Sequence, residues 1–203
     1  IGKIRKEWMD EWADHLNSKD IPIDPYRITT ELMKILNPEK SIILHDAGLC
    51  RGYICHHYTS TVPGSFVGFG GFSSMGYSIP ASIGAKVAAP EKEVVTIVGD
   101  GSFGMTGMEI ETAARYKIKT LTLVYNNRGL DAIRALQKRR EEKGVWDHVG
   151  GDYAKMARGM GAYSAHVNDP AEIRAAIETA LDQEKPAVLD INLSALVPLP
   201  NYP

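Results

Sequence analysis

The chain has 203 residues, a formal net charge of −2 and a hydrophobic content of 44%. This length is enough for one α/β domain with a hydrophobic core and is marginal for two. The nearly balanced charge gives no reason to expect nucleic acid or an anionic membrane as a partner, and no uninterrupted apolar run is long enough to span a bilayer.

The first 25 residues are predicted to form an N-terminal helix and a linker. Apolar residues recur at helical spacing within 1–19, namely Ile4, Trp8, Trp12 and Leu16. Pro22 and Pro25 then disfavour a continued helix. The chain starts at Ile1 and not at Met. The helix is therefore either the end of an upstream domain or an element packed on the chain's own core, and both interpretations stay open.

Residues 26–193 alternate between helical patterns and short apolar runs. Helices are predicted at 26–36, 77–89, 105–116, 130–142, 152–161 and 170–183, and strands at 41–46, 93–98, 119–125, 162–167 and 187–192. The segment 49–75, rich in glycine and aromatic residues, is predicted to be irregular. This alternation predicts an α/β fold with a doubly wound, mostly parallel sheet and helices on both faces. Residues 194–203 are predicted to be an extended, proline-rich tail.

Two polar residues follow two of the predicted strands. Asp100 lies just past the strand at 93–98, and Asn127 just past the strand at 119–125. Open parallel sheets bind ligands at the carboxyl ends of their strands, and neighbouring strands are about 5 Å apart. If these strands are neighbours, the two side chains can share one small ion. Either residue alone is commonly a turn former or a cap, but both together at strand ends favour a site.

A dinucleotide site is the simplest rival, because Gly99, Gly101 and Gly104 satisfy G-x-G-x-x-G between a strand and a helix. An aspartate inside the turn would repel a pyrophosphate unless a cation lay between them. The next strand also ends in two asparagines and not in a ribose-binding carboxylate. Mg²⁺ is commonly held by a few protein oxygens together with phosphates. The sequence therefore favours a diphosphate bound through a divalent metal, helped by glycine amides and the helix at 105–116.

The stretch GDGSFGMTGMEIETAARYKIKTLTLVYNN at 99–127 resembles the GDG…NN signature of thiamine-diphosphate-dependent enzymes. It is most similar to the branch of acetolactate synthase and related 2-oxoacid decarboxylases and carboligases. GGFSSMGYSIPASIGAKVAAP at 70–90 resembles the same branch, so the similarity covers residues 26–193. The resemblance implies a thiamine-diphosphate-binding fold, the cofactors thiamine diphosphate and Mg²⁺, and decarboxylation of, or carbon–carbon bond formation from, a 2-oxoacid.

The resemblance also assigns residues. The metal ligands would be the side chains of Asp100 and Asn127 and the main-chain oxygen of Gly129. Met75 would wedge between the two cofactor rings, and the carbonyl of Ser73, where related enzymes often have glycine, would accept from the cofactor's amino group. The implied cofactor-binding set is Ser73, Ser74, Met75, Gly99, Asp100, Gly101, Ser102, Asn127, Gly129 and Leu130.

The family implied by this resemblance binds its cofactor between two domains. The second, a pyrimidine-binding domain that usually belongs to another subunit, supplies the glutamate that activates the cofactor. Glu109 and Glu111 lie in the helix after GDG, on the diphosphate side, and are not credible substitutes. We therefore expect a homodimer or tetramer in the full enzyme, no turnover by this chain alone, and no assigned catalytic residue within it.

Two alternatives remain open. The chain is also compatible with a separately encoded small subunit, resembling the β subunit of sulfopyruvate decarboxylase, or with a non-catalytic nucleotide-binding or regulatory module of the same fold. The start at Ile1, with a helix before the α/β pattern, favours a fragment of a longer chain over a subunit.

Several other residues are compatible with either a functional or a structural role. His45 and Asp46 end the first strand, where they can line an active-site mouth, whereas His56 and His57 are at least as compatible with packing as with catalysis. The charged run at 134–143 is most often a solvated helix face, with a lid as the minority interpretation. Cys50 and Cys55 lack zinc-site spacing and predict reduced thiols in a soluble, cytoplasmic protein.

Overall fold

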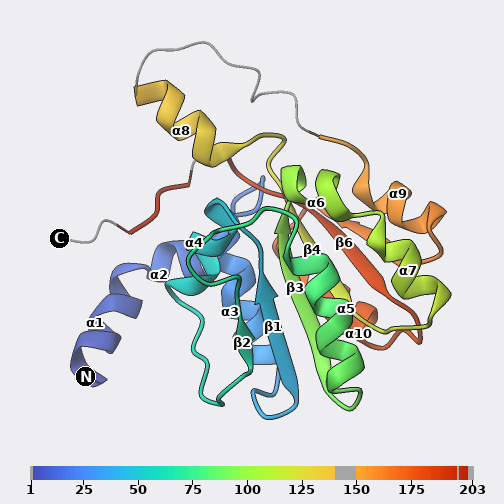
Figure 1. Cartoon of the computed structure of the whole chain (residues 1–203). Coiled ribbons are helices and arrows are strands. Elements are labelled where there is room, and N and C mark those ends of the chain that lie inside the picture. The colour runs from blue at the N-terminus through green and yellow to red at the C-terminus, as the bar shows by residue number, and fades with distance from the viewer. Residues whose placement is uncertain (1, 140–149, 196, 201–203) are drawn as a thin grey trace.

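The computed structural model describes residues 2–139, 150–195 and 197–200. They form a six-stranded sheet in the order β2-β1-β3-β4-β6-β5, with helices on both faces (Figure 1). All pairings between the described strands are parallel. The predicted doubly wound α/β fold is confirmed.

The burial of the strands explains why their sequences are continuous apolar runs and not alternating apolar and polar residues. They are β1 (Ser41–His45), β2 (Phe66–Val67), β3 (Glu93–Gly99), β4 (Leu121–Asn126), β5 (Tyr163–Val167) and β6 (Ala187–Asn192). The four inner strands are covered by helices on both faces, so nearly every residue in them is buried. β5 lies at an edge and is only partly buried.

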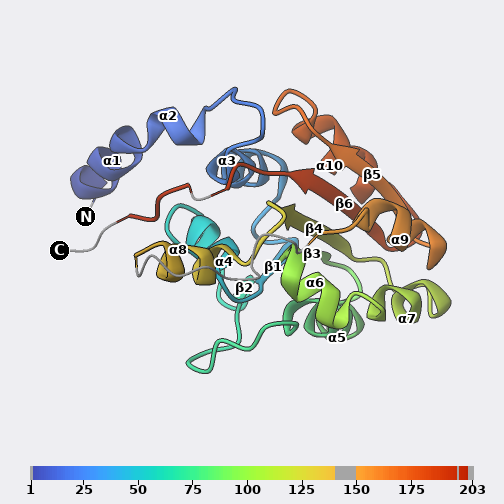
Figure 2. The same ribbon diagram turned by 90° about the horizontal axis from the view of Figure 1, so that it is seen from above.

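The helices divide between the two faces (Figure 2). One face carries α3 (Pro25–Ile35), α4 (Leu49–Cys55) and α10 (Ile173–Leu181), with α1 (Gly2–Glu11) and α2 (Ala13–Leu16) packed outside them. The other face carries α5 (Ser78–Ala88), α6 (Asp100–Thr106), α7 (Glu109–Arg115) and α9 (Tyr153–Gly159). Alternate residues of β3 serve the two cores: Val95 and Ile97 lie in the first, and Val98 lies in the second. α8 (Asp131–Arg139) stands above the carboxyl edge of the sheet (Figure 1).

Two predicted segments between residues 49 and 116 differ from the structure. The segment 49–75 is not irregular throughout, because it contains α4 and the two-residue strand β2. The burial of Cys50, Tyr53 and Ile54 at helical spacing drives α4, and β2 is held by its pairing with β1. The helix predicted at 105–116 begins earlier, at Asp100, and is interrupted between α6 and α7. Gly104 and Gly107 lower helix propensity in this stretch.

The two ends of the chain pack on the same domain. The helix predicted at 1–19 is split into α1 and α2 at Trp12, and Ile23 forms a parallel bridge with Leu193. Near the other end, Tyr26 Oη donates to the carbonyl of Pro198 at 2.9 Å. The division into 1–25, 26–193 and 194–203 stays a prediction. Of the helix predicted at 130–142, residues 140–142 lie outside the described residues.

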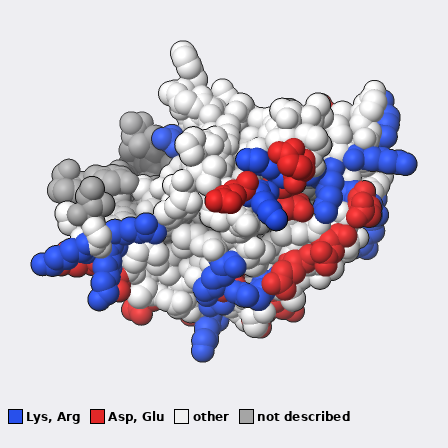
Figure 3. Space-filling view, turned by 90° about the horizontal axis from the view of Figure 1, so that it is seen from below, with Lys and Arg blue, Asp and Glu red and all other residues white. Residues whose placement is uncertain are grey.

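Charges of both signs lie next to one another on the lower face of the molecule, at the opposite edge of the sheet from α8 (Figure 3). This mixture agrees with the small net charge of −2 and creates no broad single-sign field there. None of the helices in the described ranges combines the length and apolar character needed to cross a membrane.

Candidate functional site

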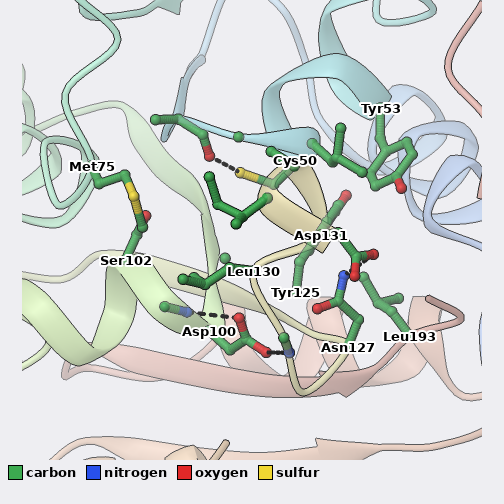
Figure 4. Close-up of a pocket in the computed structure, with 18 of the residues that line it drawn as sticks. Cys50, Tyr53, Met75, Asp100, Ser102, Tyr125, Asn127, Leu130, Asp131 and Leu193 are labelled. Atoms are coloured by element: carbon green, nitrogen blue, oxygen red, sulfur yellow. Dashed lines mark hydrogen bonds between the residues drawn. The ribbon is translucent and has the colours of Figure 1, made fainter. Parts of the chain in front are cut away.

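A cavity of about 300 Å³ lies at the carboxyl edge of the sheet (Figure 4). Its walls come from the segments that follow β1, β2, β3, β4 and β6. From β1 the chain moves to β2 on one side and later returns to β3 on the other. The cavity therefore includes the point where the strand order reverses, which is where open parallel sheets bind ligands.

Asp100 is buried at the base of this cavity, with 2% of its surface exposed. Its Oδ1 accepts from the amide of Gly101 at 2.6 Å, and its Oδ2 accepts from the amide of Gly129 at 3.0 Å. These bonds join the start of α6 to the loop after β4, which is possible because β3 and β4 are neighbours. Burial raises the pKa of the Asp100 carboxyl to about 6, against the opposing effect of the backbone amides of Gly101, Gly129 and Arg128. A bound cation would favour the ionised form.

Asn127 brings an oxygen without a partner to the same cavity. Its Nδ2 donates to Oδ2 of Asp131 at 2.6 Å. Its Oδ1 is buried and has no hydrogen-bond partner among the described residues. Buried polar atoms are nearly always satisfied, and a carboxylate with an amide oxygen nearby is a donor set that Mg²⁺ prefers. The arrangement fits a divalent cation.

Asn126, the first of the two asparagines, has a structural position instead. It is the last residue of β4, and its Nδ2 donates to Oδ1 of Asp190 at 2.9 Å. Its own Oδ1 accepts from the amide of Arg128 at 3.3 Å. Since both ends of this amide have protein partners, only Asn127 offers a free oxygen to the cavity.

The opposite wall is apolar and passes close to the GDG turn. A Cβ added at Gly101 would collide with Cδ2 of Leu130 and lie 3.5 Å from Cε of Met75. The two side chains thus approach each other over Gly101, and a side chain at this position would displace that of Leu130. Ser73 lines the cavity and has a left-handed φ of 55°.

The sequence comparisons decide the family. Residues 46–191 match the family described as "Thiamine pyrophosphate enzyme, C-terminal TPP binding domain". The chain belongs to this family. Thiamine pyrophosphate is the same compound as thiamine diphosphate, so the resemblance inferred from GDG…NN is confirmed.

Relatives within the family differ in reaction. The chain is 32% identical to a probable acetolactate synthase large subunit of Methanococcus aeolicus, over 91% of this chain and 34% of that protein. It is 35% identical to a 3D-(3,5/4)-trihydroxycyclohexane-1,2-dione hydrolase of Halalkalibacterium halodurans, over 95% of this chain and 31% of that protein. The chain spans about a third of the length of these relatives.

A solved structure has the same fold. The thiamine diphosphate-dependent 4-hydroxybenzoylformate decarboxylase of Rhodococcus jostii RHA1 aligns with a TM-score of 0.79 over 85% of this chain and 33% of that one. The sequence identity is 22%, so this similarity shows the fold alone.

Within this thiamine pyrophosphate enzyme domain, the structure brings together all but one of the predicted cofactor residues. Ser74 does not line the cavity; those that do are Ser73, Met75, Gly99, Asp100, Gly101, Ser102, Asn127, Gly129 and Leu130. Their contacts with metal and cofactor stay predictions. Glu109 and Glu111 do not line the cavity either, and Glu111 pairs with Arg115 at 3.1 Å.

The polar residues at the end of β1 have roles that the sequence did not indicate. Neither His45 nor Asp46 lines the cavity. Asp46 is fully buried. Its Oδ1 accepts from the amides of Ala47 at 2.8 Å and Gly76 at 3.0 Å, and its Oδ2 accepts from the amide of Ser78 at 2.9 Å. Asp46 therefore fastens the segment that follows Met75 to the end of β1.

Two of the three histidines of this region, His45 and His57, pack against aromatic side chains. His45 contacts Phe66 and Phe69, and burial lowers its pKa. His57 is stacked on Trp8 with ring centroids 5.5 Å apart. His56 lies outside the cavity as well. None of the three lines the cavity, so the packing interpretation is the one that the structure favours.

Several cavity residues were missed from the sequence: Cys50, Tyr53, Tyr125, Asp131 and Leu193. Cys50 is buried in the wall of the cavity, and burial raises the pKa of its thiol to about 12, which keeps it protonated. Asp131 was detectable, because it follows Asn127 by four residues at the start of a predicted helix. The predicted lid at 134–143 lies partly outside the described residues, and the part of α8 that lines the cavity is its first turn.

Proposed function

We propose that this chain binds Mg²⁺ and thiamine diphosphate as one half of an active site that breaks or forms a carbon–carbon bond in a 2-oxoacid. The observation that carries the proposal is the meeting, at one cavity, of a buried carboxylate and a buried amide oxygen without a partner, from Asp100 and Asn127. Family membership supports the identity of the cofactor.

The residues of this chain would hold and orient the cofactor. Asp100, Asn127 and the main-chain oxygen of Gly129 are the proposed metal ligands. Gly101 and Ser102 lie at the start of α6, next to the place where a diphosphate would reach that metal. Met75 and Leu130 form the apolar wall that would restrict the shape of the cofactor. When bound, thiamine diphosphate supplies a carbon nucleophile and an electron sink next to the reacting carbonyl.

The other half of the site would come from a pyrimidine-binding domain or subunit. No glutamate is among the described residues that line the cavity, although the activating group of this chemistry is expected to be one. The relatives are about three times as long as the part that this chain matches. We therefore propose a homodimer or larger assembly in which the chain alone does not turn over. The free thiols of Cys50 and Cys55 support a cytoplasmic location.

A second reaction has specific support. The relatives named as trihydroxycyclohexane-dione hydrolases are as similar to this chain as the acetolactate synthases are. Hydrolytic cleavage of a cyclic 1,2-dione is therefore the alternative reaction. Both substrate classes have a carbonyl carbon bonded to a second oxidised carbon. Product analysis with pyruvate and with a cyclohexane-1,2-dione would separate the two reactions.

Thermal melting tests the cofactor proposal. A saturating mixture of Mg²⁺ and thiamine diphosphate should raise the melting temperature by about 5–10 °C. Asp100→Ala should abolish this shift, because the metal loses its charged ligand. Asp169→Ala, which changes an acid away from the cavity, should retain it. A shift with NAD or ATP but none with thiamine diphosphate would overturn the proposal.

A further inference from the structure

The side chain of Asn127 can serve a cation only in one of its two orientations. The amide oxygen can coordinate a metal, whereas the NH₂ group presents hydrogens and repels it. Rotation by half a turn exchanges the two ends with little change in shape, so the surrounding hydrogen bonds decide the orientation. The neighbours of the NH₂ group therefore matter as much as those of the oxygen.

Asp131 is the partner that selects the orientation. Its Oδ2 lies 2.6 Å from Nδ2 of Asn127. An ionised carboxylate offers only acceptors, so the NH₂ end of the amide has to face it. Figure 4 shows the result: the nitrogen of Asn127 points toward Asp131, and its oxygen points toward the side of the cavity where Asp100 lies.

Asp131 is itself fixed in place. Only 2% of its side chain is exposed, and its Oδ1 accepts from Nη1 of Arg134 at 2.7 Å. Arg134 also reaches the carbonyl of Arg128 through Nη2 at 3.5 Å. Each carboxylate oxygen thus has its own donor. The first turn of α8 is therefore tied to the loop that carries Asn127.

We propose that Asp131 is a positioning residue for the metal site, which holds the amide of Asn127 so that its oxygen faces the cation. The proposal deepens the proposed function and rests on it for the identity of the ion. It assigns a role to Asp131 at the start of α8, which lies outside both the GDG turn and the pair of asparagines. Residues that orient a metal ligand typically change metal affinity by about 10- to 100-fold.

A role exchange between the two positions tests the proposal. Asp131→Asn replaces the oxygen that accepts from Asn127 with an NH₂ group that can only donate. The side-chain amide of Asn127 should therefore rotate by 180° and present its own NH₂ group to the cavity. Asn127→Asp combined with Asp131→Asn restores the metal ligand, because a carboxylate at position 127 has an oxygen at either end. The double variant also keeps the total charge of the pair.

The measurement is the dissociation constant of Mn²⁺, followed by electron paramagnetic resonance with thiamine diphosphate present, in the protein at its full natural length. We expect Asp131→Asn to weaken Mn²⁺ binding by about 10-fold or more, and the double variant to bind within about 3-fold of the unchanged protein. The proposal would be overturned if Asp131→Asn bound Mn²⁺ with unchanged affinity. It would also be overturned if the double variant bound Mn²⁺ as weakly as Asp131→Asn does.

A metal-free measurement separates this proposal from the proposed function. The side-chain NH₂ protons of Asn127 should resonate downfield in the nitrogen-15 correlated NMR spectrum, because one of them is bonded to a carboxylate, and Asp131→Asn should move them upfield. If the unchanged protein fails to bind Mn²⁺ with thiamine diphosphate, the proposed function is wrong, and this spectrum still decides the orientation. An Asn127 signal that Asp131→Asn leaves unchanged contradicts the orienting role.

Discussion

Asp46 shows how a buried carboxylate can organise a site without touching its ligand. It accepts hydrogen bonds from the backbone amides of Ala47, Gly76 and Ser78, with nitrogen–oxygen distances of 2.8 to 3.0 Å. Hydrogen bonds to a charged acceptor are stronger than those between neutral groups. The segment between Ser73 and Ser78, which carries Met75, is exposed over much of its length. Its position therefore depends in part on this side chain at the end of β1, together with the hydroxyl of Thr106, which donates to the carbonyl of Gly76 at 3.0 Å.

Asp46→Asn should destabilise the protein by about 1–3 kcal/mol, because the NH₂ group of the new amide faces backbone N–H groups that lose their acceptor. Urea denaturation measures the change. Asp169→Asn is the matched control, since Asp169 accepts from one amide, that of Ala171, in a more exposed turn. It should change stability by less than about 0.5 kcal/mol. Similar small changes in both variants would show that Asp46 does not hold the segment.

The N-terminal helices form an element that is joined to the domain by aromatic packing. Trp12 is 9% exposed and lies in the main core cluster. Its ring contacts Tyr26 at 5.0 Å and His57 at 5.3 Å between centroids. By contrast, α1 contains no buried residue. The attachment of this element therefore depends on Trp12, at the junction of α1 and α2, and on the half-buried Trp8 of α1, which is stacked on His57.

Trp12→Ala should cost about 3–5 kcal/mol, because it removes a large buried ring and leaves a cavity against α3. Ile4→Ala is the control on the same element, since Ile4 is 71% exposed, and it should stay within about 0.5 kcal/mol of the unchanged protein. Chemical denaturation measures both. A loss below about 1 kcal/mol in Trp12→Ala would mean that the N-terminal element is not packed as a part of the domain.

The stability of the whole molecule should depend on pH through His57. Its side chain is 2% exposed and its ring nitrogens have no hydrogen-bond partner among the described residues. Burial, together with the positive charges of His56 and His15, lowers the pKa of His57 to about 4. Between pH 6.5 and 4 the unfolded chain binds a proton at this position and the folded chain does not. Stability is therefore complete above pH 6.5 and falls as the pH drops toward 4.

The free energy of unfolding that is lost through His57 should reach up to about 3 kcal/mol at pH 4. Asp100 acts in the opposite direction, because its raised pKa of about 6 lets the folded chain bind a proton first. The comparison of unchanged protein with His57→Gln, by denaturation from pH 7 to 4, isolates the histidine: the variant should lose less stability on acidification. Parallel curves for the two proteins would rule out the role of His57.

The sequence by itself determined the fold class and the approximate place of the site. Uninterrupted apolar runs such as 93–98 and 119–125 reveal strands that are covered on both faces, and an aspartate and an asparagine directly after two such runs have to meet if the strands pair. These signals are local, since they depend on residue type and on spacing along the chain. The family was inferred from the resemblance of residues 99–127 and 70–90 to thiamine-diphosphate-dependent enzymes, and the match to the family model confirms it.

The tertiary structure decided which polar atoms have partners. Asn126 and Asn127 are equivalent in the sequence, yet Asp190 of the neighbouring strand satisfies one, while an oxygen of the other remains without a partner. Asp46 was expected at the mouth and instead binds amides about 30 residues away. The sequence likewise did not predict that α6 starts at Asp100 or that His57 packs on Trp8. Hydrogen bonds and ring contacts depend on the directions of side chains brought together from distant segments, which spacing along one chain does not specify.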